Sequence, residues 1–179
     1  MENLIQNLYN LDNKIAYSCL KELEVISYTS NEVYKFFETF VEMLDNKNSY
    51  IRTRGIVLIS SNAKWDIDNK INSIIDKFLE HIEDEKPITA RQCIKALENI
   101  IKYKKELIPI IKERLLKVNY LKYEDSMQSL IFKDVEKILD LINNPQLRYN
   151  MGQSGRSLAK NRTAENIQKK WEIFLNKIL

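Results

Sequence analysis

The chain has 179 residues and a formal net charge of +3, with only three Gly, three Pro and two Cys. So few Gly and Pro exclude a fold rich in turns or glycine loops, and two cysteines are too few for a disulfide or metal framework. The small net charge argues against a general nucleic-acid binder, and the length fits one domain with or without a short appendage.

Apolar residues recur at helical spacing through most of the chain, and no convincing stretch alternates as a β-strand does. Between residues 30 and 44, for example, one apolar stripe contains Val33, Phe36, Phe37, Phe40, Val41 and Leu44. The segments between helical patterns are only a few residues long, so successive helices must lie antiparallel. The predicted helices span residues 12–25, 30–44, 49–62, 68–82, 87–102, 105–118 and 125–142.

Alternate helices begin near residues 12, 50, 88 and 126, which is a period of about 38 residues. This period lies between those of tetratricopeptide and HEAT/armadillo repeats. Asp45 precedes Arg52 by seven residues, and Asp84 precedes Arg91 by the same number. Such Asp and Arg side chains can pair within a repeat or between neighbouring repeats, although contact with a ligand is an alternative interpretation. The pattern predicts an all-α fold, namely an α-solenoid of antiparallel helix pairs of the HEAT/armadillo kind.

Residues 1–142 resemble a family of bacterial HEAT-like proteins that is sometimes labelled SufBD-like in clostridia. The resemblance is carried by residues 48–55, 62–66, 84–93 and 122–127. It implies a helical-repeat domain over residues 1–142, with no settled activity. The family label suggests iron–sulfur assembly, but these residues contain no cysteine cluster that would hold such a metal centre.

Residues 143–179 differ in charge from the rest, with seven basic against two acidic side chains, and form a predicted second segment. Residues 143–148, 151–156 and 169–172 resemble the closing segment of retaining glycosyltransferases of the GT-B fold, two helices that hold no catalytic residues. The chain lacks the strand–helix alternation and the Gly-rich phosphate loop of those enzymes, so glycosyl transfer is not expected.

The tail is also expected to form an amphipathic helix from about Thr163. Its apolar face contains Ile167, Trp171, Phe174, Leu175 and Ile178. The terminal repeat of a solenoid leaves an apolar face open, and we expect this helical appendage to cap it. If the helix did not dock, its apolar face would bind a partner.

No catalytic constellation is apparent in the sequence. His81 is the only histidine and has no neighbouring nucleophile or second ligand, so we interpret it as a side chain at a helix end. Asp66 and Asp68 lack the further acids and Gly of a calcium loop, and they are expected to cap the helix that follows. Cys93 lies in an apolar register and is predicted to be buried. We therefore expect no enzyme activity, no metal and no cofactor.

Two sets of residues are candidates for binding. The first would cluster if the repeats stack in register, and it consists of Arg52, Arg54, Lys64, Trp65, Arg91, Gln92 and Lys133. The second is a basic surface interleaved with tyrosines that would suit phosphates and bases, and it consists of Lys102, Lys104, Lys105, Lys112, Arg114, Lys117 and Lys122. In both sets the alternative is a structural role.

These observations predict a non-catalytic scaffold or adaptor that binds another protein along a helical-repeat surface. The alternative is a nucleic-acid-binding HEAT-like protein. The N-terminus has no signal pattern and no apolar run is long enough to span a membrane, so a cytoplasmic location without membrane contact is expected.

Overall fold

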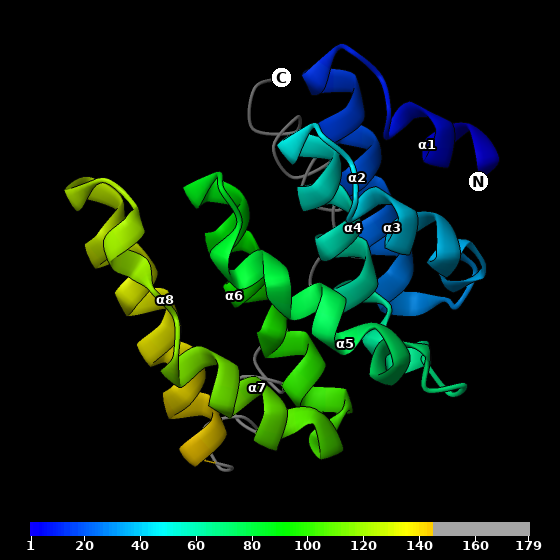
Figure 1. Ribbon diagram of the computed structural model, residues 1–179. Coiled ribbons are helices and arrows are strands. Elements are labelled where there is room, and N and C mark those ends of the chain that lie inside the picture. Colours follow the sequence, from blue (N-terminus) through cyan, green and yellow to red (C-terminus); the bar gives the residue numbers. More distant parts are fainter. Residues whose placement is uncertain (145–179) are drawn as a thin grey trace, which may run out of the picture. The chain divides into compact units, whose positions relative to one another are not determined.

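The computed structural model describes residues 1–144, and every regular element in this range is helical (Figure 1). The α-helices are α1 (Glu2–Asn7), α2 (Asn13–Thr29), α3 (Phe37–Met43), α4 (Ser49–Ser61), α5 (Lys70–Glu80), α6 (Pro87–Tyr103), α7 (Ile108–Leu116) and α8 (Asp125–Asn143). The 3-10 helices are η1 (Val33–Phe36), η2 (Ala63–Trp65), η3 (His81–Glu83), η4 (Lys105–Leu107) and η5 (Tyr120–Lys122). The predicted all-α class is confirmed for these residues, whereas the predicted tail helix and its capping role lie outside them.

The helices α2, α4, α6 and α8 pack side by side in chain order. Helix α4 contacts both α2 and α6, and α6 contacts α8 (Figure 1). Each of these helices also contacts the short element that precedes it in the chain, so that α1 packs on α2, α3 on α4, η3 on α6 and α7 on α8. The central position of α4 and α6 in this row explains why they contribute so much of the core.

Each of the predicted helices is present, with differences at their ends. The patterns at 30–44 and 105–118 begin as the 3-10 helices η1 and η4 and become α-helical only at Phe37 and Ile108. Helix α1 was not predicted, because six residues are too few to show a helical period. In α2 the structure continues four residues beyond the predicted end at residue 25.

Polar side chains start several helices. Asp12 accepts a hydrogen bond from Lys14 N at 2.8 Å, and Asn48 accepts one from Tyr50 N at 3.0 Å. Asp66 accepts from Lys70 N at 2.8 Å and from Ile71 N at 3.1 Å, which confirms its predicted capping role at α5. These bonds satisfy backbone N–H groups that have no partner within the first turn of a helix.

Helix α4 approaches α3 closely at Gly55. A Cβ atom at this position would be 2.7 Å from the backbone oxygen of Phe40 and 2.8 Å from Met43 Cβ, both in α3. Because one of these neighbours is a backbone atom, it cannot rotate away. The packing of α3 on α4 therefore requires a residue without a side chain at position 55.

We expect Gly55→Ala to lower the free energy of unfolding by about 1–3 kcal/mol, because the added methyl group overpacks this contact. Equilibrium urea unfolding followed by circular dichroism measures the change. Ser73→Ala, at an exposed position on α5, is the control and should stay within about 0.5 kcal/mol of the parent protein. Equal stability of the two variants would show that α3 can move away from α4.

Candidate functional site

The predicted binding residues occupy different environments. Arg52 and Arg54 are buried, with 7% and 5% of their surface exposed. Lys64, Trp65, Arg91 and Gln92 are half-buried, and Lys133 is exposed. The structure therefore does not present these seven residues as one exposed surface.

Arg52 forms a buried ion pair with Asp84, which precedes α6. Its Nε and Nη2 atoms each donate to one carboxylate oxygen of Asp84 at 2.7 Å. Its Nη1 donates to the backbone oxygens of Asn46 at 2.8 Å and Lys47 at 3.1 Å. The pair links the connection before α4 to the connection before α6, as expected if Asp and Arg lock neighbouring segments together.

The Asp and Arg residues that lie seven apart in the sequence do not pair with each other. Asp45 lies seven residues before Arg52 but pairs with Lys77 at 2.6 Å, on the exposed side of α5. Arg91 lies seven residues after Asp84 but pairs with Asp134 of α8 at 2.6 Å. Each of these ion pairs thus joins two different helices or their connections.

Asp84 is held by further hydrogen bonds. Its carboxylate accepts from Lys86 N at 2.9 Å and lies 3.2 Å from His81 Nδ1, while Tyr123 Oη donates to its backbone oxygen at 2.6 Å. Burial works to raise the pKa of Asp84, but the hydrogen bonds from His81 and Arg52 outweigh it and hold the pKa far below its ordinary value. Burial also raises the pKa of Tyr123 to about 12.

Arg54 anchors the N-terminal part of the chain to α4. Its Nη1 donates to the backbone oxygen of Leu8 at 2.6 Å, and its Nη2 donates to Asn13 Oδ1 at 2.8 Å. Burial lowers the pKa of this guanidinium, since no carboxylate compensates for its removal from water. Arg54 thus connects α4 to the junction between α1 and α2.

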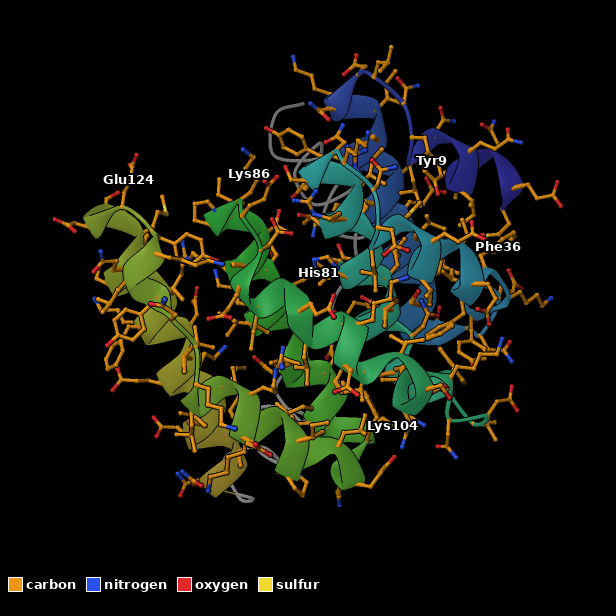
Figure 2. All side chains as sticks on the ribbon, in the orientation of Figure 1. Tyr9, Phe36, His81, Lys86, Lys104 and Glu124 are labelled. Carbon is orange, nitrogen blue, oxygen red and sulfur yellow. The ribbon has the colours of Figure 1, made fainter. Side chains whose placement is uncertain are left out.

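Lys104 belongs to a second buried network and not to a basic surface. The side chain is 5% exposed, and its Nζ lies 2.8 Å from Asp66 Oδ2 and 2.8 Å from Asn69 Oδ1. Tyr34 Oη donates to the other oxygen of Asp66 at 2.7 Å. Figure 2 shows Lys104 at the end of the row opposite to Lys86 and Glu124. The prediction that Lys104 contributes to a phosphate-binding surface is therefore wrong, because its charge is buried and paired.

The other members of the predicted nucleic-acid surface are dispersed. Lys117 pairs with Glu113 at 2.6 Å, Lys112 donates to Asn143 Oδ1 at 3.0 Å, and Lys122 donates to the backbone oxygen of Glu83. Lys105 and Arg114 are exposed, in η4 and α7. The tyrosines expected beside them are divided as well, since Tyr123 is buried and Tyr103 is partly exposed.

Lysines stacked on aromatic rings recur on the exposed side of the long helices. Lys64 Nζ lies 4.2 Å from the centre of the Trp65 ring, and Lys102 Nζ lies 4.9 Å from the centre of the Tyr103 ring. The two pairs are 38 residues apart in sequence. Trp65 Nε1 donates to the backbone oxygen of Ser27 at 2.9 Å, which fixes the ring against the end of α2.

Tyr28 completes this group of aromatic residues. It lies in the last turn of α2 and is 54% exposed. Its pKa is raised by partial burial and by the charge of Glu24, with smaller effects from Tyr103 and Glu98 of α6. Residues of η2 contact α6, and the Lys64 and Trp65 side chains donate to backbone oxygens at the end of α2, so η2 connects these two helices. We define the lysine–tyrosine face as Tyr28, Lys64, Trp65, Glu98, Lys102 and Tyr103.

No protein-family model, curated protein or solved structure matches the chain. The resemblance to HEAT-like proteins therefore stays a prediction.

Two further properties concern residues 1–144 alone. This range contains no group of three or more His, Cys, Asp and Glu side chains arranged to hold a metal ion. Its helices include none that combines the length and the apolar character needed to cross a bilayer.

The buried ion pair leads to a stability prediction. Asp84→Asn should lower the free energy of unfolding by about 3–5 kcal/mol, because it removes the buried carboxylate from Arg52 and leaves only the exposed Glu85, at 3.5 Å, as a counter-charge. Asp45→Asn is the matched control and should cost less than about 1 kcal/mol, since the Asp45 carboxylate is exposed. Urea unfolding at neutral pH measures both values, and a similar cost for the two variants would contradict a special role of Asp84.

The depressed pKa of Asp84 also predicts a dependence on pH. A carboxyl group whose pKa is lower in the folded state stabilises the fold at every pH above its unfolded value, for which the ordinary value is 3.8. This stabilisation is lost as the pH falls below that value towards the folded pKa. The free energy of unfolding of the parent protein should thus decrease more steeply between neutral pH and pH about 3 than that of Asp84→Asn. Parallel curves would contradict the assignment.

Proposed function

We propose that the chain is a non-catalytic, cytoplasmic scaffold that binds another protein on the exposed side of a helical-repeat array. The lysine–tyrosine face carries the proposal. Tyr and Trp are enriched in protein interfaces because they combine a large apolar area with a polar tip and lose little conformational entropy on binding. Here they project from separate helices and are bordered by charged side chains, as in the polar rim of an interface.

The recurrence of cross-helix hydrogen bonds supports the repeat. Trp65 donates to the backbone oxygen of Ser27, 38 residues before it, and Lys104 donates to that of Asp66 at the same separation. At the other end of the row, Tyr123 donates to the backbone oxygen of Asp84 across 39 residues. Separations of 38 or 39 residues in all three contacts favour an α-solenoid of HEAT/armadillo-like helix pairs with a period of about 38 residues, as the resemblance implies, with the tail as its proposed cap.

Among the residues predicted to bind, the proposal keeps those that reach the surface. Lys64 and Trp65 belong to the lysine–tyrosine face. Arg91 shares one side of α6 with Glu98 and Lys102, because the three are seven and four residues apart, and Gln92 is adjacent. Lys133 of α8 adjoins Asp134, the partner of Arg91. Arg52 and Arg54 are assigned to the stability of the array and not to partner contact.

Affinity capture from a lysate of the native cell, with and without nuclease, tests the proposal. The parent protein should retain a stoichiometric protein partner after nuclease treatment. Tyr28→Ala combined with Tyr103→Ala should lower the recovered partner at least about tenfold, since central aromatic residues of an interface contribute about 2 kcal/mol or more.

Tyr50→Ala is the control for this experiment, because Tyr50 is also exposed but lies at the start of α4, away from the face. It should leave the recovery unchanged. Recovery of nucleic acid, together with loss of all protein after nuclease treatment, would instead support a nucleic-acid binder. Equal recovery with all variants would remove the lysine–tyrosine face from the proposal.

A further inference from the structure

We propose that the segment docking on the lysine–tyrosine face is an acidic peptide whose carboxylates meet the ring-stacked lysines. This inference rests on the proposed function and names the chemistry of the partner. It follows from three features of the described residues, namely the local charge, the position of the ammonium groups and the character of the exposed rings.

The exposed stripes around the face are more basic than the body that carries them. On α2 the stripe Tyr17, Lys21, Glu24 and Tyr28 follows the spacing of one helical side, and on α6 the stripe Arg91, Lys95, Glu98 and Lys102 does the same. With Lys64, and with Asp134 and Lys137 of α8, which bond to the α6 stripe, these positions carry six basic and three acidic side chains. Residues 1–142 as a whole have 21 basic and 23 acidic side chains. Each of the three acids pairs with a base of the same set, Glu24 with Lys21, Glu98 with Lys137 and Asp134 with Arg91, so the nine charged side chains have a net charge of 6 − 3 = +3. The surplus of positive charge is local to this side.

The ammonium groups of the face are positioned before any partner binds. Lys64 and Lys102 of the face, and Lys21 of the neighbouring α2 stripe, each lie over an aromatic ring, at 4.2, 4.9 and 5.4 Å from its centre. Lys21 also pairs with Glu24, and Lys64 donates to the backbone oxygen of Tyr28, which holds both side chains in place. A lysine stacked on a ring has already lost part of its rotamer freedom and still has N–H donors directed away from the ring. Binding a carboxylate therefore costs less ordering entropy than it would at a free surface lysine.

The exposed rings complement such a peptide. Tyr28 and Tyr103 expose 54% and 38% of their surface, and each has a hydroxyl that can donate a hydrogen bond. Apolar side chains of the peptide would cover these rings while its carboxylates bind the flanking lysines. Charge complementarity thus determines which peptide segments bind, and the tyrosine rings supply the apolar area that the peptide buries.

The same features disfavour nucleic acid on this face. Base stacking needs an open ring face, but one face of Tyr17, Trp65 and Tyr103 already carries a lysine of the chain. Glu24 and Glu98 are interleaved with the lysines and would repel a continuous phosphate backbone.

Fluorescence anisotropy of the full chain with labelled probes tests the inference. The probe is a synthetic peptide of four Glu-Tyr-Asp repeats, and its uncharged match has four Gln-Tyr-Asn repeats. We expect the acidic peptide to bind at least about tenfold more tightly than its match at low ionic strength, and its affinity to fall as salt screens the charges. Equal affinity for the two peptides, or no binding of the acidic one, would overturn the inference.

Charge reversal locates the binding. Lys95→Glu combined with Lys102→Glu should weaken the acidic peptide at least about tenfold, since each change replaces an attraction by a repulsion of similar size. Lys35→Glu is the control, because Lys35 is exposed on η1 and lies outside the stripes. Unchanged far-ultraviolet circular dichroism would show that the variants are folded. Binding that is insensitive to the double reversal would place the peptide elsewhere, for example on the basic tail, and would also overturn the inference.

Failure of this inference can be distinguished from failure of the proposed function. A captured protein that is lost from the tyrosine variants but retained by Lys95→Glu/Lys102→Glu would leave the scaffold intact and exclude an acidic segment. Preferential binding of an oligothymidine probe, with the same dependence on Lys95 and Lys102, would instead assign the face to nucleic acid and overturn both.

Discussion

The arrangement of the central helices depends on the buried ion pair between Arg52 and Asp84. A buried charge without a partner costs several kcal/mol, so any register of α4 and α6 that separates the two groups is strongly disfavoured. The guanidinium also binds the backbone oxygens of Asn46 and Lys47, and the backbone oxygen of Asp84 accepts from Tyr123. These bonds join the connections before α4, α6 and α8 at one end of the row. The buried polar groups find their hydrogen-bond partners only when all three connections are in place.

At the other end of the row of helices, a different set of contacts joins the helices to each other. Trp65 and Lys104 each reach back 38 residues to a backbone oxygen, at Ser27 and Asp66. Between the two ends, α4 and α6 bury apolar side chains on most of their surface. On α6 the residues that reach the surface include the charged stripe Arg91, Lys95, Glu98 and Lys102, next to Tyr103. The proposed partner would contact these residues, which lie outside the buried core of the array.

The helices were predictable because their apolar periodicity is long and regular, whereas the roles of individual polar residues were not. The seven-residue spacing of Asp45 with Arg52 indicated a ladder, but only the packing shows that Arg52 pairs with Asp84 and Asp45 with Lys77. In the sequence Lys104 belongs to a run of basic residues. In the structure it follows the end of α6, and its side chain is buried and paired with Asp66. Tyr28 carries no sequence signal, since its place beside Lys64 and Trp65 depends on how η2 packs against the end of α2.

Lys64 and Trp65 show how cohesion and binding overlap in such an array. The last carbonyl groups of a helix lack partners within the helix, and these two side chains donate to those of Tyr28 and Ser27 at the end of α2. Closing α2 in this way also holds the indole ring and its stacked ammonium group in place without a ligand. Substitution of Trp65 would therefore change stability and recognition together. Substitutions of Tyr28 and Tyr103 are more informative, because their exposed rings would contribute area to the proposed partner without closing a helix of the array.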